Sequence, residues 1–182
     1  MKTLMQMFAE QDKGVIFYET VLNLKQQKHT VIECVPLPWQ HADDAPGYFR
    51  EGIMSAESDW STNKRLIDFS KRPGGFRRAM VSDLPYFMVQ FDYKGEKGYG
   101  HVIEGHDGVQ GGGDGFDVDE GEKGGGKFER FFGAETIGSM LDLEPRAWRK
   151  PKRLDAGSDK LRLQAFRKKY DKYDWTKMLA KS

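Results

Sequence analysis

The sequence predicts an α+β fold in which pairs of antiparallel strands alternate with helices. Two β-rich stretches near the start of the chain are separated by a short polar connection, and a second pair further on is joined by a turn. Segments with the apolar spacing of helices lie before, between and after these pairs. Locally paired strands with separate helices are typical of α+β folds, and 182 residues suffice to bury a core.

Residues 1–38 form the first predicted unit. Its elements are an amphipathic helix and two antiparallel strands, expected at residues 2–13, 15–20 and 29–37. Pro36 and Pro38 end the second strand, because proline offers no N–H to a strand ladder and restricts the residue before it. We therefore expect a boundary between two structural units after Pro38.

Residues 39–182 form the second predicted unit, a mixed α+β domain. We expect a helix that is capped by Asp43 or Asp44, has Pro46 in its first turn and ends near residue 58. An antiparallel hairpin, a hydrophobic helical segment and a C-terminal helix follow, at residues 85–104, at residues 127–144 and from residue 158 onward. On the C-terminal helix, one face is expected to pack through Leu163, Phe166, Tyr170 and Tyr173.

Residues 105–126 hold ten glycines among mainly acidic residues. So few apolar side chains cannot offset by burial the entropy that ordering would cost, and we expect a flexible insertion. GxGxxG-like spacings occur inside it, but no strand leads through them into a helix. They therefore do not predict a phosphate-binding loop.

The chain carries 29 basic and 28 acidic residues in an uneven order. Residues 64–78 hold six basic residues and one acidic residue, and residues 146–182 hold 13 basic and four acidic ones. Between these blocks, nine acidic residues and two lysines occupy residues 92–122. Two basic blocks suit a polyanionic partner, because phosphate binding depends on local charge density. The alternative is that the charges form ordinary solvated surface.

The four histidines and the single cysteine predict no metal site and no cofactor. His29 and Cys34 lie five residues apart on a predicted strand, so their side chains point to opposite faces and cannot share a metal. Cys34 has apolar neighbours and is expected in the core. His101 stands in an aromatic strand, where it is either a hydrogen-bonded core imidazole or part of a binding face.

A lone cysteine excludes an internal disulfide and favours a reducing compartment. The sequence has no run of 18 apolar residues and no hydrophobic signal core at its start, so neither membrane spanning nor secretion is predicted. The run RKPKR at Arg149–Arg153 has the composition of a nuclear import patch.

Six stretches of the sequence carry a family resemblance. They are HTVIECVPLP, ESDWSTNKRLIDFS, LPYFMVQF, GYGHVIE, FGAETIGSMLDLEPRAWRK and YDWT. In this order, over nearly the whole chain, they resemble the C-terminal region of CwfJ-type splicing factors. The resemblance implies the end of a unit akin to histidine-triad nucleotide hydrolases and transferases, then a unit peculiar to the family. It also implies a nuclear place in the late spliceosome, which holds the excised intron lariat.

The likeness to histidine-triad enzymes places three vestigial positions. When the strand is aligned on Pro36, the three alternating histidine positions fall on His29, Val31 and Glu33. The middle position supplies the attacking nitrogen in such an enzyme, and Val31 has no lone pair with which to attack phosphorus. We therefore predict no catalytic residues and no enzymatic activity.

The predicted function is binding of RNA by cations, with aromatic side chains on which bases stack. The candidate residues, expected to combine into one surface, are Lys64, Arg65, Arg77, Arg78, Tyr86, His101, Arg146, Trp148, Arg149, Lys150, Lys152 and Arg153. The alternative role of each aromatic residue is packing in the core.

Together with these observations, the resemblance implies a noncatalytic splicing-factor module that assists lariat release or debranching. The partners that the resemblance implies are spliceosomal proteins, intron lariat RNA or snRNA and, as a further candidate, the lariat debranching enzyme. Two alternatives stay open. One is a phosphodiesterase or nucleotide hydrolase in which His101 or His29 acts as acid or base. The other is a scaffold that contacts only proteins.

Overall fold

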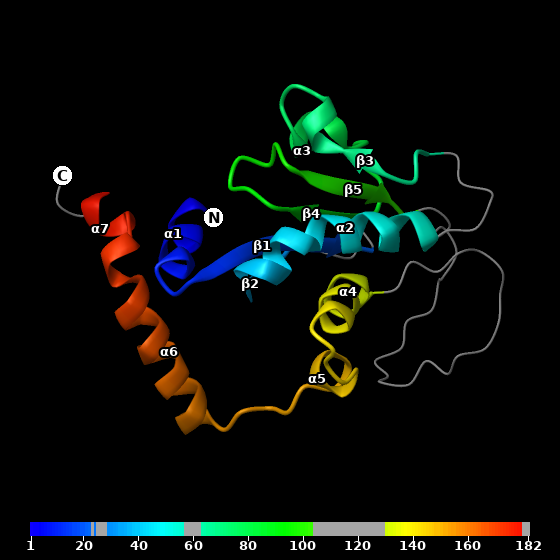
Figure 1. Ribbon diagram of the computed structural model, residues 1–182. Helices are drawn as coiled ribbons and strands as arrows, with labels where there is room; N and C mark the ends of the chain where they lie inside the picture. The colour runs from blue at the N-terminus through cyan, green and yellow to red at the C-terminus, as the bar shows by residue number, and fades with distance from the viewer. Residues whose placement is uncertain (23, 25–28, 57–62, 104–129, 180–182) are drawn as a thin grey trace.

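The computed structural model describes residues 1–22, 24, 29–56, 63–103 and 130–179 (Figure 1). The glycine-rich insertion predicted at residues 105–126 lies outside these residues. The described part of the chain has the predicted α+β fold, with an antiparallel sheet, helical segments packed on it and a C-terminal helix.

One five-stranded antiparallel sheet organises the fold. Its strands are β1 (Lys13–Val21), β2 (Glu33–Pro38), β3 (Ile67–Asp68), β4 (Tyr86–Gln90) and β5 (Gly98–Val102), in the order β2-β1-β4-β5-β3. Both predicted strand pairs form, since Tyr18 lies opposite Glu33 and Phe87 lies opposite His101. The pairs join where Tyr18 of β1 lies opposite Val89 of β4. Strands from before and after the expected boundary at residue 38 thus share one sheet.

Helical segments precede, connect and follow the strands. They are α1 (Lys2–Ala9), α2 (Trp39–Ser55), α3 (Phe76–Ala79), α4 (Phe132–Met140), α5 (Arg146–Arg149), α6 (Ala156–Tyr170) and α7 (Thr176–Leu179), with 3-10 turns η1 (Phe69–Lys71) and η2 (Asp171–Tyr173). Helix α2 begins directly after β2 and not at the predicted caps Asp43 or Asp44, so Pro46 lies inside it. Burial explains this extent: Ala45, Phe49 and Ile53, spaced four apart, are fully buried on one face, which outweighs the N–H that Pro46 lacks.

One face of the sheet forms the main core with α2 and α4. Alternate strand positions point to it, among them Tyr18 of β1 and Phe87 and Val89 of β4. The ring of Phe49 in α2 stacks on Phe87 with centroids 6.1 Å apart, and Phe132 of α4 meets Phe87 edge-on at 4.9 Å. These aromatic contacts fix both helices on the sheet.

The opposite face of the sheet is covered by η1 and α3. Met88 of β4 packs there against Phe69 of η1. Two glycines of β5 leave room for the segments that cover this face. A Cβ on Gly100 would lie 2.2 Å from Met80 Sδ, and a Cβ on Gly98 would lie 2.9 Å from the Phe69 ring. The short helix α3 is therefore held close against the sheet.

Helix α6 stands beside the body of the molecule and meets α1 near its own C-terminal end (Figure 1). There the hydroxyls of Tyr170 and Thr3 are hydrogen-bonded at 3.0 Å. The prediction that Leu163 and Phe166 pack was wrong, because their side chains are 47% and 41% exposed. The helix contacts the body through one end, which leaves the middle of its length without a covering surface among the described residues.

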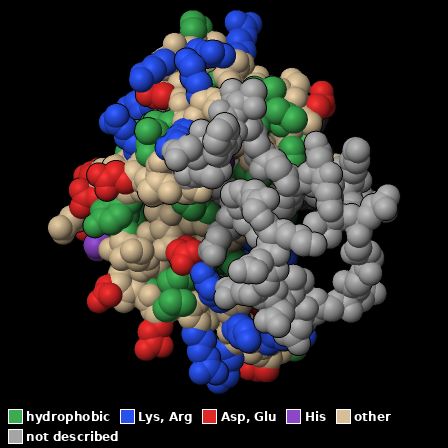
Figure 2. Space-filling model, turned by 90° about the vertical axis from the view of Figure 1, so that its right-hand side faces the viewer, with side chains coloured by type: hydrophobic (Ala, Val, Ile, Leu, Met, Phe, Trp, Pro, Cys, Tyr) green, Lys and Arg blue, Asp and Glu red, His purple; other side chains and the backbone are tan. Residues whose placement is uncertain are grey.

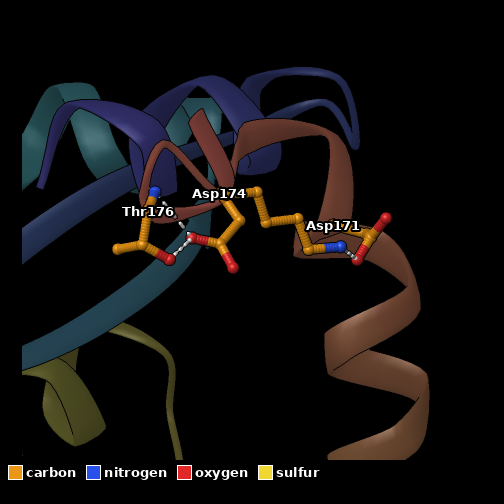
Figure 3. Close-up of polar contacts among 4 residues, drawn as sticks. Asp171, Asp174 and Thr176 are labelled. Atoms are coloured by element: carbon orange, nitrogen blue, oxygen red, sulfur yellow. Dashed lines mark hydrogen bonds and ion pairs between the residues drawn. The ribbon is translucent and has the colours of Figure 1, made fainter. Parts of the chain in front are cut away.

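Side-chain contacts fasten the last turns of the chain to one another (Figure 3). The carboxylate of Asp174 accepts the backbone N–H of Thr176 at 3.1 Å, where α7 begins. Lys177 forms an ion pair with Asp171, the first residue of η2. The hydrogen bonds from Thr176 lower the pKa of Asp174, so the capping group is a carboxylate at neutral pH.

Candidate nucleic-acid interface

The first basic block folds around α3 and is called the α3 patch below. Its members are Lys64, Arg65, Lys71, Arg72, Arg77 and Arg78. Phe76 is the first residue of α3, and its ring packs edge-on against Phe69 at 5.6 Å and at a tilt against Tyr86 at 5.7 Å between ring centroids. Because Phe76 points to the sheet, the next two residues, Arg77 and Arg78, are exposed. The local sequence FRR thus anchors the turn and presents its cations.

A cavity of about 390 Å³ lies within the α3 patch. Lys64, Lys71 and Arg72 line it beside Asp68, whose carboxylate lies 3.7 Å from Lys71 Nζ. Burial raises the pKa of Asp68, but hydrogen bonds from Ser70 and the charge of Lys71 outweigh it and the pKa is lowered. One carboxylate against three cations leaves the cavity positively charged. Lys71 and Arg72 were missing from the predicted site, although the basic block itself was the signal for them.

The second basic block follows α4 and is called the α5 patch below. Its members are Arg146, Arg149, Lys150, Lys152 and Arg153, and all are exposed. Trp148 anchors α5, because its ring lies so close to Gly138 of α4 that a Cβ there would be 2.2 Å away. Arg149 also donates to Glu135 Oε1 of α4 at 3.2 Å. With Trp148 turned inward, the neighbouring cations point outward.

The two patches do not form one surface, which corrects the prediction. Figure 1 places α3 and α5 at opposite ends of the body, with the sheet and α4 between them. Figure 2 shows Lys and Arg side chains gathered at these two ends of one face, with hydrophobic and acidic side chains between. The reason is topological: α3 covers one face of the sheet, whereas α5 follows α4, which packs on the other.

Three of the predicted RNA contacts have packing roles instead. His101 is 2% exposed, and its Nδ1 lies 2.9 Å from the backbone oxygen of Arg65. Tyr86 is half-buried against Phe76, and its hydroxyl donates to the buried Glu19 at 2.8 Å. Trp148 is half-buried on α4, with Nε1 inaccessible to solvent. A ring stacks on a base only where its face is open, so the prediction is corrected: His101 is a buried residue, and Tyr86 and Trp148 are half-buried packing residues.

The vestigial triad positions do not lie on one strand. Strand β2 begins at Glu33, so the prediction that it starts at His29 was wrong. His29 and Val31 precede the strand, and Val31 is 66% exposed. Glu33 accepts the hydroxyl of Tyr18 at 2.8 Å. Burial, with this hydrogen bond, raises the pKa of Tyr18 and keeps the phenol protonated.

Other site types were sought in the described part of the chain. It contains no group of three or more His, Cys, Asp or Glu side chains placed to hold a metal ion. None of its helices has the length and apolar character needed to cross a membrane. Cys34 is half-buried, and burial raises the pKa of its thiol to about 11, so the thiol is protonated at neutral pH.

The fold and the patches together define an α+β protein built on one antiparallel sheet that presents cations at two separate ends. Comparison with known families narrows this class. The chain belongs to the CwfJ C-terminal family: the family described as "Protein similar to CwfJ C-terminus 2" matches residues 59–176, and "Protein similar to CwfJ C-terminal" matches residues 1–50. The predicted resemblance is confirmed, and β1 and β2 of one match share a sheet with β4 and β5 of the other.

Curated relatives match almost the whole chain. CWF19-like protein 2 of Homo sapiens is 38% identical over 176 residues, which cover 97% of this chain and 17% of that protein. Pre-mRNA-splicing factor cwf19 of Schizosaccharomyces pombe is 35% identical over 184 residues, which cover 98% of this chain and 26% of that protein. CWF19-like protein 2 homolog of Drosophila melanogaster is 33% identical over 175 residues, or 96% of this chain and 22% of that protein. The chain thus spans a minor part of each of these relatives.

Proposed function

We propose that this chain is a noncatalytic, RNA- and protein-contacting module of a nuclear pre-mRNA splicing factor that acts in the late, intron-lariat spliceosome. Membership of the CwfJ family supports a splicing role, as does the name of the relative pre-mRNA-splicing factor cwf19. The observation that carries the proposal is the pair of basic patches at opposite ends of the body, with the sheet and α4 between them. Cations on one scaffold neutralise phosphates at two set places.

Two separated patches suit an RNA in which more than one strand segment must be held. In this proposal the α3 patch binds one segment of the branched intron, or an snRNA beside it, and the α5 patch binds another. Holding both would assist lariat release or debranching, with spliceosomal proteins, among them the lariat debranching enzyme, as neighbours. The exposed run Arg149–Arg153 supports nuclear import.

We propose that the chain is not catalytic because the residues that could act as nucleophile or base are unsuitable or wrongly placed. Val31 offers no nitrogen for attack on phosphorus. His101 is buried in the core, where it cannot reach a phosphodiester in solution. His29 is exposed but precedes β2, apart from the strand on which a histidine triad would be aligned. These placements favour recognition over hydrolysis.

The test is binding of 2′-5′ branched RNA and of linear RNA of the same composition, measured by fluorescence anisotropy across about 50–200 mM salt. We expect affinity to fall steeply with salt. The double variants Arg77→Ala/Arg78→Ala and Lys150→Ala/Lys152→Ala should each weaken binding and reduce the log–log salt slope by about one to two. Their effects should add, because the two patches lie at opposite ends of the body and do not contact each other.

Arg50→Ala is the matched control, since Arg50 is an exposed cation on α2 outside both patches, and it should leave binding unchanged. A flat salt response, or double variants that bind like the original chain, would contradict RNA binding by these patches. Turnover of the branched substrate by the purified chain would contradict the noncatalytic part.

A further inference from the structure

A second cavity, of about 270 Å³, lies on the face of the sheet that η1 and α3 cover. Met88 and Gln90 of β4 form its floor. Its sides are Phe76 and Arg77 of α3 and the loop after β4. Tyr18 and Glu33 point to the other face, so this cavity does not coincide with the vestigial triad positions.

Gln90 is the unusual group in this cavity. Its side chain is 5% exposed, yet Oε1 has no hydrogen-bond partner among the described residues. A buried amide oxygen without a partner costs about 1–3 kcal/mol, and native proteins rarely retain one without a reason. A ligand that donates a hydrogen bond from inside the cavity would satisfy Gln90.

The wall beside Gln90 is built by close backbone approach. Gly95, at φ 72, lies against the Gln90 amide, since a Cβ on it would be 2.9 Å from Nε2. The oxygen of Gly95 accepts the N–H of Phe76 at 2.9 Å. Gly75, at φ 55, permits this bond, because a Cβ there would be 2.1 Å from the same oxygen. The cavity is therefore preorganised by contacts that glycine alone allows.

The rest of the lining combines cations and aromatic rings with Gly74 and the apolar residues Met1 and Ile32. Arg77 and Lys94, both exposed, are at the cavity together with the rings of Phe76 and Tyr93. Lys2 Nζ adds a third cation, 5.7 Å from the centroid of the Tyr93 ring. None of the described residues that line the cavity is acidic, so its field favours an anionic group.

We propose that this cavity holds a single unpaired RNA nucleotide, with a base N–H donating to Gln90 Oε1 and the phosphate between Arg77 and Lys94. Splayed-out bases are read in this way by amide side chains and aromatic rings in RNA-binding proteins. The volume is near the lower limit of small-molecule sites, about 300 Å³, and excludes a base pair. This site rests on the proposed RNA-binding function and gives the α3 patch a specific contact.

The test is an NMR titration of the full 182-residue chain with AMP, CMP, GMP and UMP, and with ribose 5-phosphate as the ligand without a base. We expect at least one nucleotide to shift the Gln90 side-chain amide and the Gly95 backbone amide. Ribose 5-phosphate should bind at least about tenfold more weakly, since it lacks the base hydrogen bond. Equal binding of ribose 5-phosphate would show a simple anion site and overturn the proposal.

Variants separate the contacts. Gln90→Met, close in size, should weaken nucleotide binding at least about tenfold. Arg77→Ala and Lys94→Ala change exposed side chains and do not require the sheet to repack. Each should weaken nucleotide binding about threefold or more. Lys97→Ala changes a neighbouring exposed cation that does not line the cavity, so it is the matched control and should leave nucleotide binding unchanged. An equal loss of binding in this control would overturn the site.

The outcome is distinguishable from that of the proposed function. If branched and linear RNA bind with a steep salt response but no nucleotide shifts Gln90 or Gly95, the cavity proposal is wrong and the basic patches stand. If nucleotides bind in the cavity while neither RNA binds the chain, the cavity stands and the proposed function fails.

Discussion

The indole ring of Trp148 lies directly over Gly138, so close that a Cβ at position 138 would be 2.2 Å from two ring carbons. Gly138 belongs to α4 and Trp148 to α5, which makes this contact the joint between the two helices. A backbone hydrogen bond from Leu143 to the oxygen of Gly138, at 2.8 Å, closes the turn between them. The orientation of the α5 patch therefore depends on a glycine, with no side chain, at position 138.

Gly138→Ala should destabilise the protein by up to about 2 kcal/mol. Alanine improves helix propensity by about 1 kcal/mol, but the added methyl group must displace the whole indole ring, and overpacking costs about 1–3 kcal/mol. Urea denaturation measures the difference in the free energy of unfolding. Gly47→Ala is the matched control, because Gly47 is inside α2 with open space around it, and it should stabilise by about 0.5–1 kcal/mol. Equal effects of both substitutions would contradict the packing role of Trp148.

Sequence patterns predicted the locally encoded parts of the fold. The hairpin of β4 and β5 is joined by a turn of seven residues, at 91–97, and is visible from its alternation and turn residues. The pairing of β1 with β4 was not predictable, because it joins Tyr18 to Val89, which lies 71 residues further along the chain. The start of α2 was missed for a related reason, since Ala45 is buried by tertiary contacts that no local rule reports.

The candidate site was predictable in composition but not in geometry. Charge blocks indicated the cations of both patches, including Arg77 and Arg153, from their order along the chain. Their separation depends on which face of the sheet each helix covers. His101 had two open roles because its partner, the backbone of Arg65, lies 36 residues away. Gln90 gave no signal, since an unsatisfied amide exists only once the fold surrounds it.

Tyr86→Phe should destabilise the protein by about 1–3 kcal/mol. The hydroxyl of Tyr86 donates to Glu19, a carboxylate that is 3% exposed and whose other oxygen has no partner in the described structure. Removing the donor leaves both oxygens of this buried carboxyl group without a hydrogen bond that the structure shows. Tyr18→Phe is the comparison, because its acceptor Glu33 is exposed and water can replace the hydroxyl. It should cost about 0.5–1.5 kcal/mol in urea denaturation, and a larger loss for Tyr18→Phe would contradict this account.

Stability should fall as pH rises above about 10. Burial first, then hydrogen bonds to Glu33 and Glu19, raise the pKa values of Tyr18 and Tyr86 above the ordinary value near 10. The folded state keeps these protons at a pH at which the unfolded state has lost them, so the free energy of unfolding decreases with pH. The stability that these two tyrosines contribute is fully present below about pH 10, and it is lost as the pH rises through their pKa values in the folded state.

Urea denaturation between about pH 9 and 11 measures this slope. Tyr18→Phe and Tyr86→Phe should each make the decline shallower. Cys34, with a pKa raised by burial to about 11, adds a decline of the same sign, so the comparison is best made in a Cys34→Ala background. Tyr48→Phe, at an exposed tyrosine of α2, should leave the slope unchanged, and a shallower decline in this variant would contradict the assignment.

His101→Ala should destabilise the fold by about 2–5 kcal/mol without weakening RNA binding by the folded protein. His101 is 2% exposed and hydrogen-bonded to the backbone oxygen of Arg65, so its removal leaves a cavity beside β5 and deletes this hydrogen bond. Lys64→Ala should weaken RNA binding without destabilising the fold, because Lys64 is exposed and lines the positive cavity of the α3 patch. Denaturation and RNA anisotropy on the same two variants measure both effects, with RNA affinity referred to the folded fraction. A His101→Ala protein that stays as stable as the original chain but loses RNA binding or phosphodiester turnover would return this residue to a functional surface.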